Sequence, residues 1–143
     1  MTAKEYLQQV KKLDNLIANK IAEKQQWYEM ATGSAVRLTP DKVQTSGNLH
    51  RMEDAVARIV DIEREIDKQI DFFVDTKQEV IRTIEQLKDN EYDFLHKVYI
   101  QYKSLAEVAE MKGYEYTWAT TTHGRALKNL QTILDERKNK NCD

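Results

Sequence analysis

Residues 102–130 read YKSLAEVAEMKGYEYTWATTTHGRALKNL, and this stretch decides the fold of the C-terminal part of the chain. Ser104 followed three residues later by Glu107 is a capping box, in which each side chain bonds a free backbone N–H of the first helical turn. The apolar face of this short helix is formed by Leu105, Val108 and Ala109. Gly113 stands where the helix must end, because glycine readily adopts the left-handed backbone of a C′ residue.

A second helix is predicted after a bend at residues 114–116. Its apolar positions are Ala119, Ala126, Leu127, Leu130, Ile133 and Leu134. Two helices joined by a few residues with a central glycine describe a helix-turn-helix, whose second helix usually enters the major groove of DNA. The sequence therefore predicts a DNA-recognition helix at residues 116–130.

Length and composition favour an all-α protein. The chain has 143 residues, which fits one domain or two very small ones. A charged fraction of 32% with four Gly and one Pro leaves few helix breakers. The net charge of −2 argues against non-specific binding of nucleic acid. The window 116–130 is locally basic, since it holds Arg125, Lys128 and His123 and no acid.

Several classes of protein are excluded by what the sequence lacks. A single Cys142 cannot form an internal disulfide, and three His with one Cys show no ligand spacing for a metal. A phosphate-binding Gly loop is absent, as is a nucleophile paired with a base, so we expect no enzyme and no cofactor. The N-terminal sequence lacks the apolar run of a signal peptide, and no segment reaches membrane-spanning length. The sequence therefore predicts a cytoplasmic protein.

The first helix is predicted at residues 2–31, where Thr2 and Glu5 form another capping box. Its apolar face recurs at spacings of three and four through Tyr6, Val10, Leu13, Ile17, Trp27 and Ala31. The loop 32–48 follows, with half of the glycines and the only proline. It is either a long surface connection, with Val36, Leu38 and Val43 tucked against the helices and one short turn at Pro40, or a loop that contacts nucleic acid or a partner.

Ser46 or Asn48 caps the second, longer helix, which is predicted at residues 49–87. Its heptad-like apolar stripe indicates a coiled coil, with gaps at Glu63 and Lys77. The stripe consists of Met52, Val56, Ile59, Ile66, Ile70, Phe73, Val80, Ile84 and Leu87, widened by Ile62, Val74 and Ile81. This helix would be about 58 Å long against about 45 Å for the first. We therefore expect an antiparallel hairpin at residues 1–87, whose surplus at 77–87 packs on the C-terminal unit or on another subunit.

The second predicted domain, residues 88–143, begins with a helix capped by Asn90, with Asp93 as its N3 residue. The apolar face of this helix contains Tyr92, Phe94, Leu95, Val98, Tyr99 and Tyr102. It is the first of three helices and covers the back of the helix-turn-helix. A polar tail at residues 137–143 closes the chain.

The run VYIQYKSLAEVAEMKGYEYTWATTTHGRALKNL, residues 98–130, resembles region 4 of bacterial sigma-70 factors. The matching positions are Tyr99 or Tyr102, Ser104-Leu105-Ala106-Glu107-Val108-Ala109, Gly113 and Arg125-Ala126-Leu127-Lys128-Asn129-Leu130. The whole chain is similar to phage and prophage transcriptional regulators of the ArpU/RinA type. These share the opening TAKEYLQQVKKLDNLI, the segment Val43-Gln44-Thr45-Ser46-Gly47, a long charged helix and the sigma-like C-terminus.

This resemblance implies a transcriptional regulator in the cytoplasm of a bacterial host. Its partners would be double-stranded DNA and RNA polymerase, the latter contacted by the hairpin or by the helix at 90–101. A homo-oligomer through the long helix is a further expectation. Two other readings stay open: a DNA-packaging component similar to a small terminase subunit, and a coiled-coil adaptor that binds no DNA.

Helical periodicity sorts the residues of the recognition helix. Those expected to face inward are Trp118, Ala119, Thr122, His123 and Ala126. Those expected to contact bases are Thr117, Thr120, Thr121 and Gly124, because threonine hydrogen-bonds base edges and touches the thymine methyl group. Those expected to contact phosphates are Lys103, Ser104, Tyr116, Arg125 and Lys128. Alternatively, Thr120 and Thr121 are a solvated face and Arg125 bridges to an acid of the hairpin.

Overall fold

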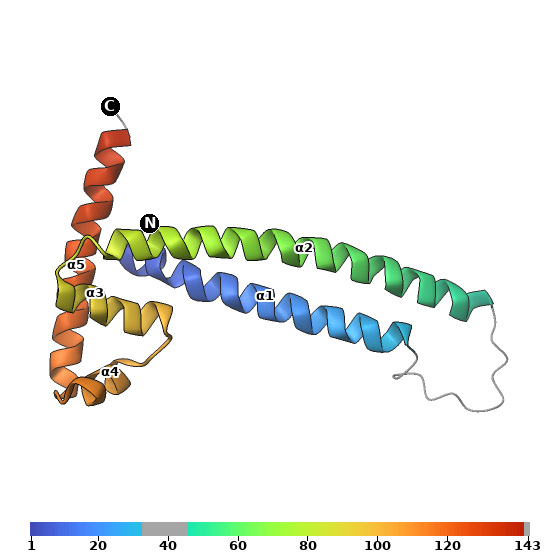
Figure 1. Ribbon diagram of the computed structural model, residues 1–143, viewed down its shortest axis with the longest axis horizontal. Helices are drawn as coiled ribbons and strands as arrows, with labels where there is room; N and C mark the ends of the chain where they lie inside the picture. The colour runs from blue at the N-terminus through green and yellow to red at the C-terminus, as the bar shows by residue number, and fades with distance from the viewer. Residues whose placement is uncertain (33–45, 142–143) are drawn as a thin grey trace. The chain divides into compact units, whose positions relative to one another are not determined.

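The computed structural model describes residues 1–32 and 46–141, with only the backbone given for residues 46–48, and this part of the chain is helical without any strand (Figure 1). The elements are α1 (Ala3–Ala31), α2 (Ser46–Ile84), α3 (Asp89–Leu95), the π-helical turn η1 (His96–Ile100), α4 (Leu105–Lys112) and α5 (Tyr116–Asn141). The predicted all-α class is confirmed. α2 begins at Ser46, three residues before the predicted start at 49, so Asn48 lies inside the helix and cannot cap it. The expectations for the loop that follows Thr32, for a side-chain cap at Ser46 and for Cys142 lie outside what the structure describes.

The chain divides into two compact units. Unit 1 comprises Met1–Leu13 and Phe73–Asp143, and unit 2 comprises Asp14–Phe72. Both long helices contribute to both units, so the predicted division between residues 87 and 88 falls inside unit 1. The reason is that the end of the hairpin shares its apolar core with the C-terminal helices.

The core of unit 1 combines residues from all of its helices. Its buried members are Ala3, Tyr6, Leu7, Val10, Val80, Ile84, Phe94, Leu95, Ile100, Val108, Ala109, Ala119, Ala126 and Leu130. Because Val80 and Ile84 belong to this cluster, the expected packing of the surplus of α2 on the C-terminal helices is confirmed. A buried polar link joins the same elements: the hydroxyls of Tyr6 and Thr83 lie 2.9 Å apart, and Arg137 Nη2 donates to Thr83 Oγ1 at 3.0 Å.

The predicted first helix is confirmed, and its first turn is capped by Thr2 Oγ1, which accepts a hydrogen bond from the Glu5 N–H at 3.1 Å. α1 and α2 run side by side in opposite directions (Figure 1). Ion pairs such as Lys20–Glu65 and Lys24–Glu63 join them in this antiparallel register. α2 ends at Ile84, before the predicted residue 87, because i→i+3 hydrogen bonds from Gln86 and Leu87 tighten its last turn.

The predicted apolar stripe of α2 is partly wrong. Two sets of positions alternate along the side of α2 that faces α1: residues 59, 66, 73, 80 and 87, and residues 55, 62, 69, 76 and 83. Of the second set only Ile62 was predicted, and the predicted stripe instead followed the neighbouring row through Val56, Ile70 and Ile84. In the structure Ala55 and Ile62 are buried, whereas Val56 and Ile70 are exposed. The error arose because the true set holds polar Gln69, Thr76 and Thr83, whereas the neighbouring row holds the apolar residues Val56, Ile70 and Ile84 between its charged members.

In heptad terms the two sets are the a and d positions, and the neighbouring row is the e position. On α1 the corresponding d residues are 6, 13, 20 and 27, so its e row contains Leu7, Asp14, Ile21 and Tyr28. In an antiparallel helix pair, e positions of both helices flank the same edge, and g positions flank the other. The apolar residues of the e row therefore lie along one edge of the hairpin.

The start of the predicted second domain differs from expectation. α3 begins at Asp89, after Lys88 as N-cap, and no side chain caps it. Asn90 therefore lies within the first turn rather than at the cap. Asp93 instead forms ion pairs with Lys97 and with Lys112, the latter at 2.8 Å. Burial raises the pKa of Asp93, but hydrogen bonds from Lys112 and Lys97 outweigh it, and the net shift is downward.

The helix predicted at 90–101 is not regular, because η1 interrupts it. The Gln101 N–H donates to the His96 carbonyl at 3.0 Å, an i→i+5 bond that widens this turn. The wider turn shifts the apolar face by one residue and buries Ile100. At the other end of the unit, the predicted polar tail is helical to Asn141, and Arg137 is held by its ion pair with Glu79 at 3.3 Å.

Within residues 1–32 and 46–141, the structure contains no helix with both the length and the apolar character that crossing a membrane requires.

Candidate nucleic-acid interface

The N-terminus of α4 is set by Ser104. Its backbone is extended (φ −73°, ψ 161°), and its Oγ accepts a hydrogen bond from the Glu107 N–H at 3.1 Å. This is the N-cap half of the predicted capping box. Val108 and Ala109 are the buried residues of α4 and anchor it to the core of unit 1. The cap therefore fixes where α4 starts, and its apolar pair fixes which side faces inward.

The turn after α4 depends on Gly113. Its backbone is left-handed (φ 74°, ψ 28°), a conformation that residues with a Cβ rarely adopt. The Tyr114 N–H donates to the Ala109 carbonyl at 2.9 Å, and the Gly113 N–H donates to the Glu110 carbonyl at 3.1 Å. These two bonds form a Schellman motif, which ends α4 and leads directly into α5. The predicted C′ role of Gly113 is confirmed.

α5 buries one side of its N-terminal half, as predicted. Ala119, Thr122 and Ala126 are buried, and Trp118 and His123 are half-buried. Small residues at these positions let α5 lie close against the other helices of unit 1. The orientation of the helix is therefore decided by packing.

The opposite side of α5 carries the residues predicted to contact bases. Thr117, Thr120, Thr121 and Gly124 are all exposed. The Thr120 hydroxyl donates to the Thr117 carbonyl at 2.9 Å, so its oxygen keeps a lone pair for an external donor. A Cβ built on Gly124 meets no heavy atom within 4 Å, so packing within the chain does not explain a glycine there. The structure brings these four residues together on one exposed surface.

The residues predicted to contact phosphates are also accessible. Ser104, Tyr116, Arg125 and Lys128 are exposed, and Lys103 is half-exposed. Within residues 1–32 and 46–141, no ion pair joins Arg125 to an acid, so the alternative of a bridge to the hairpin is wrong there. Acids are exposed nearby in sequence as well, at Glu107, Glu110 and Glu115.

The connection before α4 holds Lys103 in place. The Lys103 N–H donates to the Lys97 carbonyl at 2.9 Å. The preceding Tyr102 has a left-handed backbone (φ 60°), which costs about 1 kcal/mol in a residue other than glycine. Its ring packs against the core and lies under Lys11 Nζ, 5.5 Å from the ring centre. Tertiary packing therefore maintains a strained residue next to a predicted phosphate contact.

His123 has the predicted packed role. Its Nε2 lies 2.7 Å from the Tyr99 hydroxyl, and the two rings stack with centroids 5.8 Å apart. Burial, and secondarily the charge of Lys4, lowers the pKa of His123. Burial also raises the pKa of Tyr99. Both shifts favour the neutral forms, which suits a packed aromatic pair rather than a charged contact.

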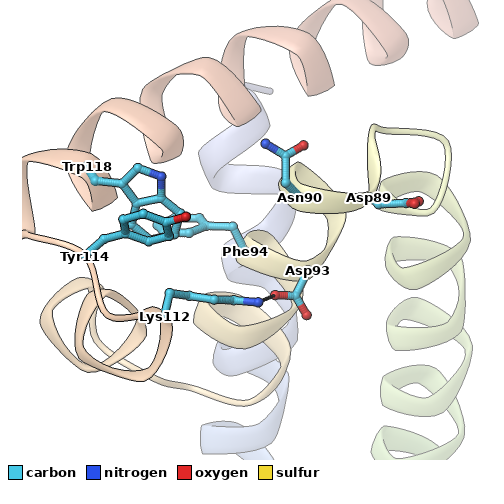
Figure 2. Close-up of a pocket in the computed structure, with 7 residues that line it drawn as sticks. All are labelled: Asp89, Asn90, Asp93, Phe94, Lys112, Tyr114 and Trp118. Carbon is cyan, nitrogen blue, oxygen red and sulfur yellow. Dashed lines mark ion pairs between the residues drawn. The ribbon is translucent and has the colours of Figure 1, made fainter.

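An open pocket lies beside the turn that joins α4 and α5. It is lined by Asp89, Asn90, Asp93, Phe94, Lys112, Tyr114 and Trp118. Figure 2 shows the stacked rings of Tyr114 and Trp118, 4.6 Å apart between centroids, and the ion pair that joins Lys112 to Asp93. The rings of Phe94 and Trp118 pack edge to face, with their centroids 5.7 Å apart. These contacts explain the half-burial of Trp118 by packing, as predicted.

Sequence reasoning missed one buried polar contact of unit 1. Glu91 is 2% exposed, and its two carboxyl oxygens accept hydrogen bonds from Asn129 Nδ2 at 2.7 and 3.0 Å. This contact ties α3 to α5 immediately after the recognition residues. Asn129 lies three residues after Ala126 and one before Leu130, which places it at the edge of the buried face of α5. This position in the sequence could have indicated that the Asn129 side chain has a buried partner.

No cluster of three His, Cys, Asp or Glu side chains suited to a metal ion occurs in the described part of the chain. Comparison of the chain with protein-family models, with curated proteins and with solved structures finds no match. A function for this protein therefore has to be argued from its own residues.

Proposed function

We propose that this protein binds double-stranded DNA through the exposed side of α5 and acts as a transcriptional regulator of phage or prophage type. One observation carries the proposal: Thr117, Thr120, Thr121 and Gly124 form an exposed surface on the N-terminal half of a helix that follows a Schellman turn. A helix presented in this way fits the major groove, where its N-terminal residues contact base edges. The similarity to sigma-70 region 4 supports the same assignment.

Each residue has a role in this proposal. Thr120 and Thr121 hydrogen-bond base edges or touch thymine methyl groups, and Gly124 allows a close approach of the helix backbone. Arg125, Lys128 and Lys103 neutralise phosphates, and the hydroxyls of Ser104 and Tyr116 bond phosphate oxygens. RNA polymerase would then be contacted by another part of the same chain when the protein occupies a promoter-proximal site.

The test is fluorescence-anisotropy binding to DNA that flanks the protein's own gene, measured at two salt concentrations. We expect sequence-selective binding that weakens as salt rises, because phosphate contacts release counterions. Replacing Thr120, Thr121 and Arg125 with Ala should abolish selective binding without changing the far-UV circular dichroism. Arg125→Ala alone should reduce the slope of log affinity against log salt by about 1.

A matched control lies on the same helix, where Thr132 and Lys138 are exposed beyond the recognition surface. The Thr132→Ala, Lys138→Ala variant should bind DNA as the wild type does. Equal loss in both variants, or no loss in the triple variant, would remove the assignment of the recognition surface.

The exposed acids Glu107, Glu110 and Glu115 favour a second candidate, a coiled-coil adaptor that binds a protein instead of DNA. A folded protein that binds no DNA at low salt would support this candidate. Ring-like oligomers that bind DNA would instead support a packaging component.

A further inference from the structure

Among the residues that the structure describes, the apolar side chains of the e row are buried in unit 1 and exposed in unit 2. In unit 1, Leu7 and Ile84 are both 0% exposed and belong to the core that includes the C-terminal helices. In unit 2, Ile21 is 52%, Tyr28 53% and Val56 52% exposed, although they occupy the same row of the same two helices. Apart from Asp14, Glu63 and Lys77 the row is apolar in both units, and among the described residues only unit 1 supplies a layer that buries it.

The composition of this row indicates that α1 and α2 of unit 2 pack in a bundle of more than two helices. Two-stranded coiled coils carry apolar residues at a and d only, with charges at e and g. Helices that pack in larger bundles carry a third apolar position, at e or g. In unit 2 the exposed apolar side chains of the e row are Ile21, Tyr28, Leu49, Val56 and Ile70. This is the pattern of a helix pair that packs against a further pair.

The opposite edge of unit 2 is mixed, because it exposes Leu16, Met30 and Phe72 but also carries a network of ion pairs. There Arg58 Nη2 lies 3.1 Å from Glu23 Oε1, and Arg58 Nη1 lies 3.7 Å from Glu65 Oε1. Lys20 Nζ also reaches Glu65 Oε2 at 2.7 Å. The hydrogen bond from Lys20 lowers the pKa of Glu65, so this network stays ionised. On that edge three exposed apolar side chains alternate with paired charges, whereas the e row of unit 2 exposes five apolar side chains, which makes the e row the more apolar surface.

We propose that the e row of unit 2 is the interface of a homodimer, in which a second copy packs its own e row face to face to form a four-helix bundle. A two-fold interface requires a patch that is complementary to itself. The e row is mostly apolar, and of its two acidic residues in unit 2, Asp14 and Glu63, Glu63 is already paired with Lys24 at 3.1 Å. Two flat helix pairs with apolar inner faces are the layers of which such bundles consist.

The available area suits this partner. The stretch of α2 between Leu49 and Ile70 is about 32 Å long, and two helices side by side are about 20 Å wide. Two copies would therefore bury about 1,200 Å² in total, the lower end of what a specific interface needs. The proposal does not rest on DNA binding, but a dimer would give each molecule two copies of α5.

Sedimentation equilibrium of the full chain without DNA tests the proposal. We expect the wild type to dimerise in the micromolar range. The Ile21→Glu, Val56→Glu variant should weaken association at least about 30-fold, because dimerisation would bury its carboxylates without partners. Both positions are exposed in one copy, so the helical circular dichroism signal should not change.

The matched control places the same charge on the opposite edge, where Leu16 is 38% and Phe72 57% exposed. The Leu16→Glu, Phe72→Glu variant should dimerise like the wild type. A wild type that remains monomeric throughout the micromolar range would overturn the proposal. So would equal weakening in both double variants, because the interface would then not follow the e row.

Discussion

The two units use the same pair of helices in different ways. In unit 1 the apolar rows of α1 and α2 are buried by α3, α4 and α5, whereas the apolar residues that are buried in unit 2 are Ile17, Ala55, Ile62 and Ile66. Unit 2 even places Lys20 at a d position and Lys24 at an a position, where they pair with Glu65 and Glu63, respectively. Exposed ion pairs contribute little to stability, so burial by a third layer decides which part of a hairpin is firmly held.

The largest effect we predict compares two residues of the same row of α1. Leu7→Ala should lower the free energy of unfolding by about 2–5 kcal/mol, because it leaves a cavity in a packed core. Ile21→Ala should change it by less than about 1 kcal/mol, because Ile21 is half-exposed in one copy. Urea denaturation at a protein concentration too low for association measures both. Equal losses would show that the two units are equally packed.

The second effect concerns the buried polar contact of unit 1. Asn129→Ala should cost about 1.5–3 kcal/mol, because Glu91 would remain buried without the amide that donates to both of its oxygens. The Glu91→Leu, Asn129→Ala double variant should lose less than the sum of the single losses. Urea denaturation of the three variants provides the double-mutant cycle. Additive losses would contradict the coupling.

The third effect has the opposite sign and separates packing from function in α5. Gly124→Ala should stabilise the protein by about 1 kcal/mol, because alanine is the better helix former and its Cβ meets open space. The same change should weaken DNA binding if the helix backbone approaches DNA at this point. Thermal unfolding and anisotropy of one variant measure both quantities. A stabilised variant with unchanged DNA binding would remove Gly124 from the interface.

The smallest effect is a difference in pH dependence between the units. Burial, then Lys4, lowers the pKa of His123 in unit 1 below its ordinary value of 6.5. The unfolded chain therefore binds the proton more readily, and this stability is present above about pH 6.5 and lost as pH falls through the lowered pKa. In unit 2, the hydrogen bond from Lys20 lowers the pKa of Glu65 from 4.5. The stability that Glu65 contributes is therefore lost only at a pH more acidic than the range in which His123 titrates.

His123→Gln should therefore reduce the fall in stability between pH 7 and pH 5. His96 provides the control, because burial and the charge of Lys97 also lower its pKa. The His96→Gln variant should retain the part of the pH dependence that belongs to His123. Urea midpoints at several pH values measure this, and a wild-type pH dependence in His123→Gln would contradict the assignment.

Much of the local structure could be predicted from the sequence because local interactions decide it. The cap at Ser104, the left-handed turn at Gly113 and the inward and outward sides of α5 follow from residues a few positions apart, and all are confirmed. The same holds for α1 and its cap at Thr2.

The tertiary structure alone decided three features. These are the side of α2 that faces α1, the π turn at residues 96–100 and the contact of Glu91 with Asn129. On α2 the d row and the neighbouring e row each mix apolar and polar residues, and its sequence does not say which of the two rows α1 covers. The cover from α3, α4 and α5 buries the e row in unit 1, and in unit 2 the same row is left exposed. Sequence by itself determined the caps at Thr2 and Ser104 and the turn at Gly113, because those depend on neighbours along the chain. Which apolar row is buried depends on residues distant in sequence, so only packing in three dimensions decided it.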